Sequence, residues 1–108
     1  MSIDDREKAF ENKYAHDQQM FFKIEARASR LIGMWAADLM GLNGPDATTY
    51  AKEVVASNLD EPGFDDVKRK VQADFKAANV EVTDHTFDAI IEKKMAEARK
   101  QVEDEAKA

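Results

Sequence analysis

Residues 21–39 read FFKIEARASRLIGMWAADL, and this is the stretch that decides the fold of the 108-residue chain. Its apolar side chains recur at steps of three and four, the period that lines one face of an α-helix. We therefore predict a helix with its apolar face in the core and with Trp35 in the interior. The apolar stripe consists of Phe21, Ile24, Ala28, Leu31, Ile32, Trp35 and Leu39.

Three further helices are expected after this one. Gly41 and Gly44–Pro45 separate the first two, because glycine adopts the left-handed cap conformation and proline suits a first helical turn. A Pro62–Gly63 turn precedes the third helix, and Thr83 is a good N-cap for the fourth, which we expect to fray beyond Val102. The three stripes are Ala47, Tyr50, Ala51, Val54, Val55 and Leu59, then Phe64, Val67, Val71, Phe75 and Ala78, then Phe87, Ile90, Ile91, either Lys94 or Met95, Ala98 and Val102.

The composition excludes several classes of protein. The chain is 44% hydrophobic and 35% charged, which suits a single soluble helical domain, and we predict an all-α four-helix bundle. It has no cysteine, so disulfides and thiol chemistry are excluded. A net charge of -6 gives no general attraction to nucleic acid. The longest uncharged apolar run, Leu31–Ala37, cannot cross a bilayer, and the N-terminus lacks a signal sequence, so we expect a cytoplasmic location without membrane insertion.

No residue pattern indicates catalysis or a resident metal or cofactor. His16 and His85 lack the spacing of a metal motif, and no serine or threonine has the context of an activated nucleophile. The acidic run 60–66 departs from a calcium loop at its third and sixth positions and is better explained as a turn followed by first-turn carboxylates. We expect a protein that is not an enzyme.

Weak binding of ATP or ADP is an alternative that the sequence leaves open. A helix N-terminus can hold an anion, and basic side chains can supply positive charge beside it. A solvated basic face explains the same side chains. The candidate nucleotide-binding residues are Arg27, Arg30, Lys68, Arg69 and Lys70.

Residues 1–20 carry only a thin apolar stripe. Because a segment that buries so little cannot offset its ordering entropy, we expect an N-terminal arm that is weakly structured in the free protein and becomes helical on a partner. The bundle would then span residues 21–108. Arg6, Phe10 and Tyr14 share one helical face and are the candidate anchors for that partner. The alternative is that the arm extends the first helix and packs on the bundle.

The sequence resembles the bacterial ζ subunit family, natural inhibitors of the F-type ATP synthase. The specific block reads DDRE at 4–7, AFE at 9–11 and KYAHD at 13–17, followed by LIGMWAA at 31–37. Less specific matches, such as Glu61–Gly63, extend the likeness to about residue 102. Met34 and Met40 stand where the family favours leucine, a change that preserves volume.

This resemblance implies a four-helix bundle with a mobile arm that inserts into the catalytic sector of the synthase and blocks its rotation during ATP hydrolysis. It also implies residence at the inner face of the membrane through the synthase. Two other hypotheses remain: a nucleotide-sensing helical module, and an adaptor for an unrelated protein. The partner-binding residues implied by the resemblance are Asp4, Asp5, Arg6, Glu7, Phe10, Glu11, Lys13, Tyr14, His16 and Asp17.

Overall fold

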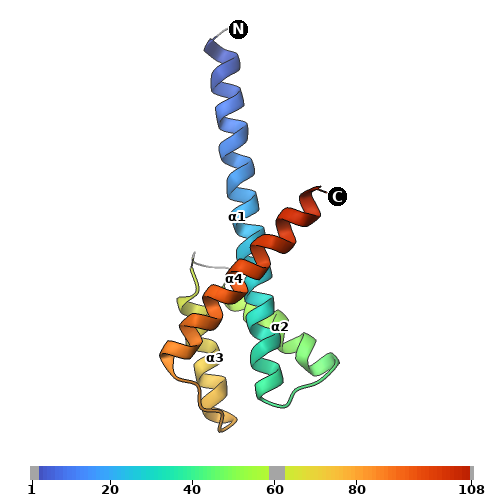
Figure 1. The fold of residues 1–108 in the computed structure, drawn as a ribbon, viewed down its shortest axis with the longest axis vertical. Helices are drawn as coiled ribbons and strands as arrows, with labels where there is room; N and C mark the ends of the chain where they lie inside the picture. Colours follow the sequence, from blue (N-terminus) through green and yellow to red (C-terminus); the bar gives the residue numbers. More distant parts are fainter. Residues whose placement is uncertain (1–2, 59–62, 108) are drawn as a thin grey trace.

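The described residues of the protein form four α-helices. The computed structural model describes the backbone of residues 3–58 and 63–107, and within these ranges the side chains from residue 18 onward. The described ranges contain no strand, so the all-α prediction is confirmed. The helices, shown in Figure 1, are α1 (Ile3–Leu39), α2 (Pro45–Ser57), α3 (Asp65–Ala77) and α4 (Asp84–Lys107).

Helix α1 is the central element, because it contacts each of the other three helices. Its C-terminal part lies among them, whereas its N-terminal part extends past their ends (Figure 1). The molecule is correspondingly elongated, with principal extents of 62 × 27 × 21 Å. The fold therefore consists of three helices packed along one part of a longer helix.

Three aromatic rings organise the larger half of the core. Trp35 of α1 meets Phe75 of α3 and Phe87 of α4 edge to face, with ring centroids 5.5 Å apart in each pair. Such edge-to-face pairs are favoured by the ring quadrupoles. Phe75 and Phe87 are buried, but Trp35 is only partly buried against the core cluster, so its predicted interior position is correct only in part.

A smaller core cluster joins α1 to the second half of α4. Ile24 and Ala28 of α1 pack with Ala98 and Val102 of α4, and all four are buried. Because Val102 is fully buried, the last turns of α4 are held against α1 and the helix continues to Lys107. The predicted fraying beyond Val102 is therefore wrong for the residues up to 107.

The two ends of the predicted α1 stripe are also wrong as core positions. Phe21 and Leu39 are each 44% exposed. The helical period places both on the correct face of α1, but no neighbouring core cluster includes them. An apolar stripe shows which face of a helix can be buried. The rest of the chain decides how much of that face the other helices cover.

The helix ends follow the local chemistry expected from the sequence. Gly41 has a positive φ of 78°, and the Leu42 N–H donates to the Ala37 carbonyl at 2.8 Å, which closes the end of α1 as a Schellman motif. Pro45 occupies the first turn of α2. Thr83 accepts a hydrogen bond from the Thr86 N–H at 3.1 Å, which confirms it as the N-cap of α4.

Helices α1 and α2 lie close together at Gly33. A Cβ atom added there would lie 2.7 Å from the Ala51 Cα and 3.2 Å from the Val54 Cβ. Because the first of these neighbours is backbone, the two helices would have to move apart to accept it. Glycine at this position therefore sets the α1–α2 distance.

Replacing Gly33 by alanine should destabilise the protein, although alanine is the better helix former. We expect the free energy of unfolding to fall by about 1–3 kcal/mol, the usual range for overpacking a core. Urea denaturation followed by circular dichroism measures this change. The matched control is M34A on the exposed side of the same turn, which should change stability little; an unchanged or raised stability in G33A would contradict the close approach.

Candidate functional site

The predicted partner-binding residues all belong to the N-terminal part of α1. Their backbone is included in the helix from Ile3, but their side chains lie outside the described part of the chain. The ten residues are Asp4, Asp5, Arg6, Glu7, Phe10, Glu11, Lys13, Tyr14, His16 and Asp17. Their roles remain predictions.

The following turn of α1 is the first whose side chains are described, and it is mostly exposed. Phe21 and Phe22 are 44% and 62% exposed. Met20 is partly buried against the smaller core cluster, and the first buried side chain along the described part of α1 is that of Ile24. Close packing of α1 against the other helices thus begins about one turn after the predicted arm ends.

An ion cluster fixes the end of α4 to α1 at this point. The Arg27 guanidinium lies 2.8 Å from a carboxylate oxygen of Glu105 and donates to the Gln101 Oε1 at 2.9 Å. The Lys23 Nζ is 3.8 Å from the same Glu105 carboxylate. These contacts lie beside the buried Val102 and position the last turns of α4 along residues 23–28 of α1.

The loop between α2 and α3 is tied to α1 by two buried polar side chains. Glu25 is 5% exposed and its Oε1 accepts the Gly63 N–H at 3.0 Å. The fully buried Ser29 hydroxyl accepts from the Asn58 amide at 3.1 Å. The Asn58 contact fixes the chain before residues 59–62, and the Gly63 contact fixes it after them. The predicted core residue Leu59 and the acidic residues Asp60 and Glu61 lie outside the described residues.

The five candidate nucleotide-binding residues do not converge. Arg27 faces the end of α4, and on α3 the three consecutive cations face three directions. The Lys68 ammonium group donates a hydrogen bond to the Asp88 carboxylate of α4 at 2.8 Å, and this bond raises the pKa of Lys68. Arg69 pairs with Asp66 at 3.1 Å.

Lys70 points the other way, towards α2. Its Nζ lies 3.2 Å from Asp74 and 3.7 Å from Glu53, and 5.4 Å from the centre of the Tyr50 ring. Adjacent acids therefore pair with these three cations of α3, Lys68, Arg69 and Lys70. These positions account for the basic side chains without a ligand.

Arg30 differs from the other candidates because it has no ion pair with another described residue. It lines a groove of about 340 Å³ between α1 and α2, together with Lys52. Sequence reasoning missed Lys52, which looks like an ordinary solvated position in its own helix. Only the packing of α1 against α2 brings the two cations to one groove, whose other lining residues are Thr48, Ala51 and Val55.

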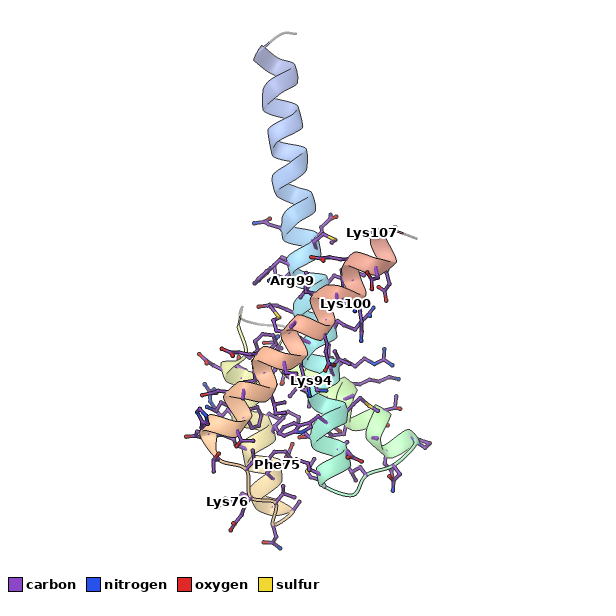
Figure 2. All side chains as sticks on the ribbon, in the orientation of Figure 1. Phe75, Lys76, Lys94, Arg99, Lys100 and Lys107 are labelled. Atoms are coloured by element: carbon purple, nitrogen blue, oxygen red, sulfur yellow. The ribbon has the colours of Figure 1, made fainter. Side chains whose placement is uncertain are left out.

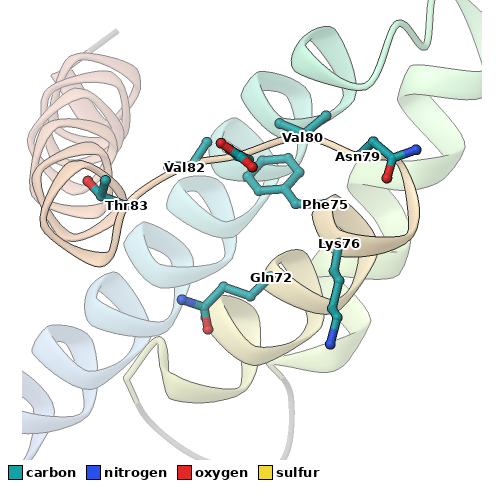
Figure 3. Close-up of a pocket in the computed structure, with 8 residues that line it drawn as sticks. Gln72, Phe75, Lys76, Asn79, Val80, Val82 and Thr83 are labelled. Atoms are coloured by element: carbon teal, nitrogen blue, oxygen red, sulfur yellow. The ribbon is translucent and has the colours of Figure 1, made fainter.

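A second hollow, of about 670 Å³, lies beneath the connector from α3 to α4 (Figure 3). Phe75, Val80 and Val82 supply apolar walls, and Gln72 is held by a hydrogen bond of 2.7 Å to Asp84. Asn79 turns the chain with a positive φ of 58°. The Thr83 hydroxyl in the lining donates to the Thr86 hydroxyl at 2.9 Å and accepts from the Thr86 N–H, so it is used in capping α4.

Basic and acidic side chains are mixed along the outer surface of α4. Lys94, Arg99, Lys100 and Lys107 recur along the helix (Figure 2), and Lys94 pairs with Glu97 at 3.5 Å. His85, in the first turn, is exposed. Among the described residues no three His, Asp or Glu side chains form a group suited to a metal ion, and none of the helices is a candidate membrane span.

The described side chains thus lie on an all-α scaffold of four helices. The model of the family of ATPase inhibitor subunit zeta matches residues 1–101, and the chain belongs to this family. Membership indicates a regulatory inhibitor that acts on the ATP synthase.

The comparison with solved structures supports the fold. One protein, described only as a solution NMR structure, is 40% identical, with a TM-score of 0.69, covering 80% of this chain and 98% of the other. The comparison with curated proteins gave no match.

The contact between α2 and α3 gives a pH-dependent prediction. The buried Tyr50 hydroxyl donates to the Asp74 carboxylate at 2.7 Å. Burial, and then this bond, raise the pKa of Tyr50 far above its usual value. The folded state therefore keeps the phenol proton that the unfolded state loses above about pH 10.

We expect Y50F to lower the free energy of unfolding by about 1–2 kcal/mol at neutral pH, because a buried bond to a charged group is lost. The difference in free energy of unfolding between Y50F and the wild type should shrink as the pH rises above about 10. In that range the unfolded wild-type chain loses the Tyr50 proton that the folded state keeps, and this favours the unfolded state. Urea titrations of both proteins between pH 7 and 11 measure this difference. A difference that stays constant or grows with pH would contradict the expected decrease.

Proposed function

We propose that this protein inhibits ATP hydrolysis by the F-type ATP synthase by inserting residues 1 to about 19 into the catalytic sector and blocking its rotation. The protein is then a non-catalytic wedge, held at the cytoplasmic face of the membrane by the synthase. The observation that carries the proposal is that α1 begins at Ile3, whereas its first buried described side chain is Ile24.

The energetics of such a wedge are those of binding without chemistry. Ordering a segment of the chain costs conformational entropy, which buried aromatic anchors and charge-assisted contacts must offset. Phe10 and Tyr14 are proposed as the anchors, and the surrounding charges as the groups that set register. Inhibition follows if the segment binds one rotary state more tightly than the next, so it is non-covalent and reversible.

The helices that remain after removal of the arm should fold without it, because the described core begins at Met20. A chain of residues 20–108 is expected to keep its helicity and its melting temperature within a few degrees. Its inhibition of ATP hydrolysis by the isolated catalytic sector should disappear. Full inhibition by the shortened chain would overturn the proposal.

A substitution within the arm tests the anchors without shortening the chain. The double variant F10A/Y14A should raise the concentration for half-maximal inhibition about 30-fold, since two aromatic anchors each contribute roughly 1 kcal/mol or more. The matched control is K8A, because the helical period places Lys8 opposite Phe10. Equal inhibition by the two variants would argue against an aromatic contact face.

A second candidate function, weak binding of ATP or ADP, is favoured by the groove between α1 and α2. Arg30 and Lys52 both line it, and neither has an ion pair with a described residue. Two cations beside apolar walls suit a phosphate with an attached base. Arg27, Lys68, Arg69 and Lys70 are weaker candidates because each already has an acidic partner.

Nucleotide binding can be measured by amide chemical shifts on addition of ATP. We expect shifts centred on Arg30 and Lys52, and their loss in the variant K52Q. R69Q serves as control, because Arg69 is exposed on α3 and pairs only locally with Asp66. Shifts that centre on residues 68–70 would move the site to α3, and an absence of shifts would exclude the function.

A further inference from the structure

Two adjacent phenylalanines remain uncovered where the packed part of α1 begins. Phe21 and Phe22 are 44% and 62% exposed, and their rings lie edge to face with centroids 6.4 Å apart. Neither ring belongs to either core cluster of the described residues. Single exposed apolar residues are ordinary, but two aromatic rings side by side form a patch suited to a partner.

The helical period connects Phe21 with the buried face of α1. Phe21 and Ala28 are seven positions apart, close to two full turns, so they share one face. Ala28 is fully buried beneath α4, where Val102 covers it. Phe21 therefore continues the buried face beyond the point at which α4 stops covering it.

The same period extends in the other direction, towards the arm. Tyr14 precedes Phe21 by seven positions, so the sequence places the proposed anchor and Phe21 on one face of a continuous helix. With a rise of about 1.5 Å per residue, Phe21 lies only about 3 Å along the helix axis from Gln19. A partner that encloses the helix up to residue 19 must reach Phe21 as well.

We propose that Phe21 and Phe22 form a second part of the contact with the catalytic sector of the ATP synthase, packing on an apolar surface of that sector. This inference rests on the proposed function, because it assigns the same partner. Next to these rings, Lys23 and Arg27 pair with Glu105 and hold the end of α4 against α1. Met20, one position before Phe21, is partly buried against the cluster that α1 shares with α4. The end of α4 thus limits how deeply α1 can enter the partner.

The first test compares two double variants of the full chain. F21A/F22A should raise the concentration for half-maximal inhibition of ATP hydrolysis at least tenfold, as expected for two aromatic anchors. The control M34A/L39A removes two side chains of similar exposure, 40% and 44%, from the far end of the same helix. It should change inhibition less than twofold.

The second test detects the contact itself. A photoreactive phenylalanine analogue at position 22 should cross-link to a subunit of the catalytic sector, and the same analogue at position 39 should not. This readout separates direct contact from an effect of the substitutions on the helix. Unchanged inhibition by F21A/F22A, or no cross-link from position 22, would overturn the inference.

The chain of residues 20–108 separates this inference from the proposed function. If shortening abolishes inhibition while F21A/F22A inhibits like the wild type, the proposed role of the arm is supported and the proposed contact of the phenylalanines is wrong. If the shortened chain still inhibits and F21A/F22A does not, the proposed contact of the phenylalanines is supported and the proposed role of the arm is wrong. If the full chain does not inhibit, both are overturned.

Discussion

The structure depends on a mismatch in length between α1 and the helices that cover it. Helix α1 runs from Ile3 to Leu39, but the described core clusters use its residues only from Met20 onward. An apolar face on a helix is stable in water only where something covers it. The covered part of α1 therefore organises the fold, and we propose the N-terminal remainder as the part that binds a partner.

The covered part is fixed by contacts of two kinds. Gly33 allows the backbones of α1 and α2 to approach, while the rings of Trp35, Phe75 and Phe87 fill the space between α1, α3 and α4. Steric fit of this kind tolerates little displacement. The position of α1 relative to the other helices is thus determined at its C-terminal half, and the direction in which its N-terminal half leaves the core follows from it.

Most of the fold was predictable from residue spacing and from the ends of the helices. Gly41, Pro45 and Thr83 act through backbone geometry and local hydrogen bonds, which depend on few neighbours. Burial was less predictable, because it depends on residues far apart in the chain. Phe21 and Leu39 have the correct helical phase but no covering helix, and the end of α4 is ordered by Arg27, which lies far from it in sequence.

The candidate sites show the same division. The sequence marks Lys68, Arg69 and Lys70 as a basic cluster, yet consecutive residues on a helix face different directions and each cation meets its own acid. The pairing of Arg30 with Lys52 in one groove arises only from packing between helices. Nearness along a helical segment is therefore a weak guide to a charged site.

The same reasoning explains why a regulatory contact can be placed at the start of the packed helices. Covering Phe21 within the protein would require side chains of α4 to lie over its ring, and this would remove the aromatic patch from any partner. Leaving it exposed costs little in the free protein, because a patch of two rings lies within the apolar area that folded monomers commonly expose. The boundary set by Glu105 and Val102 thus divides one apolar face into a part that stabilises the fold and a part that remains available for binding.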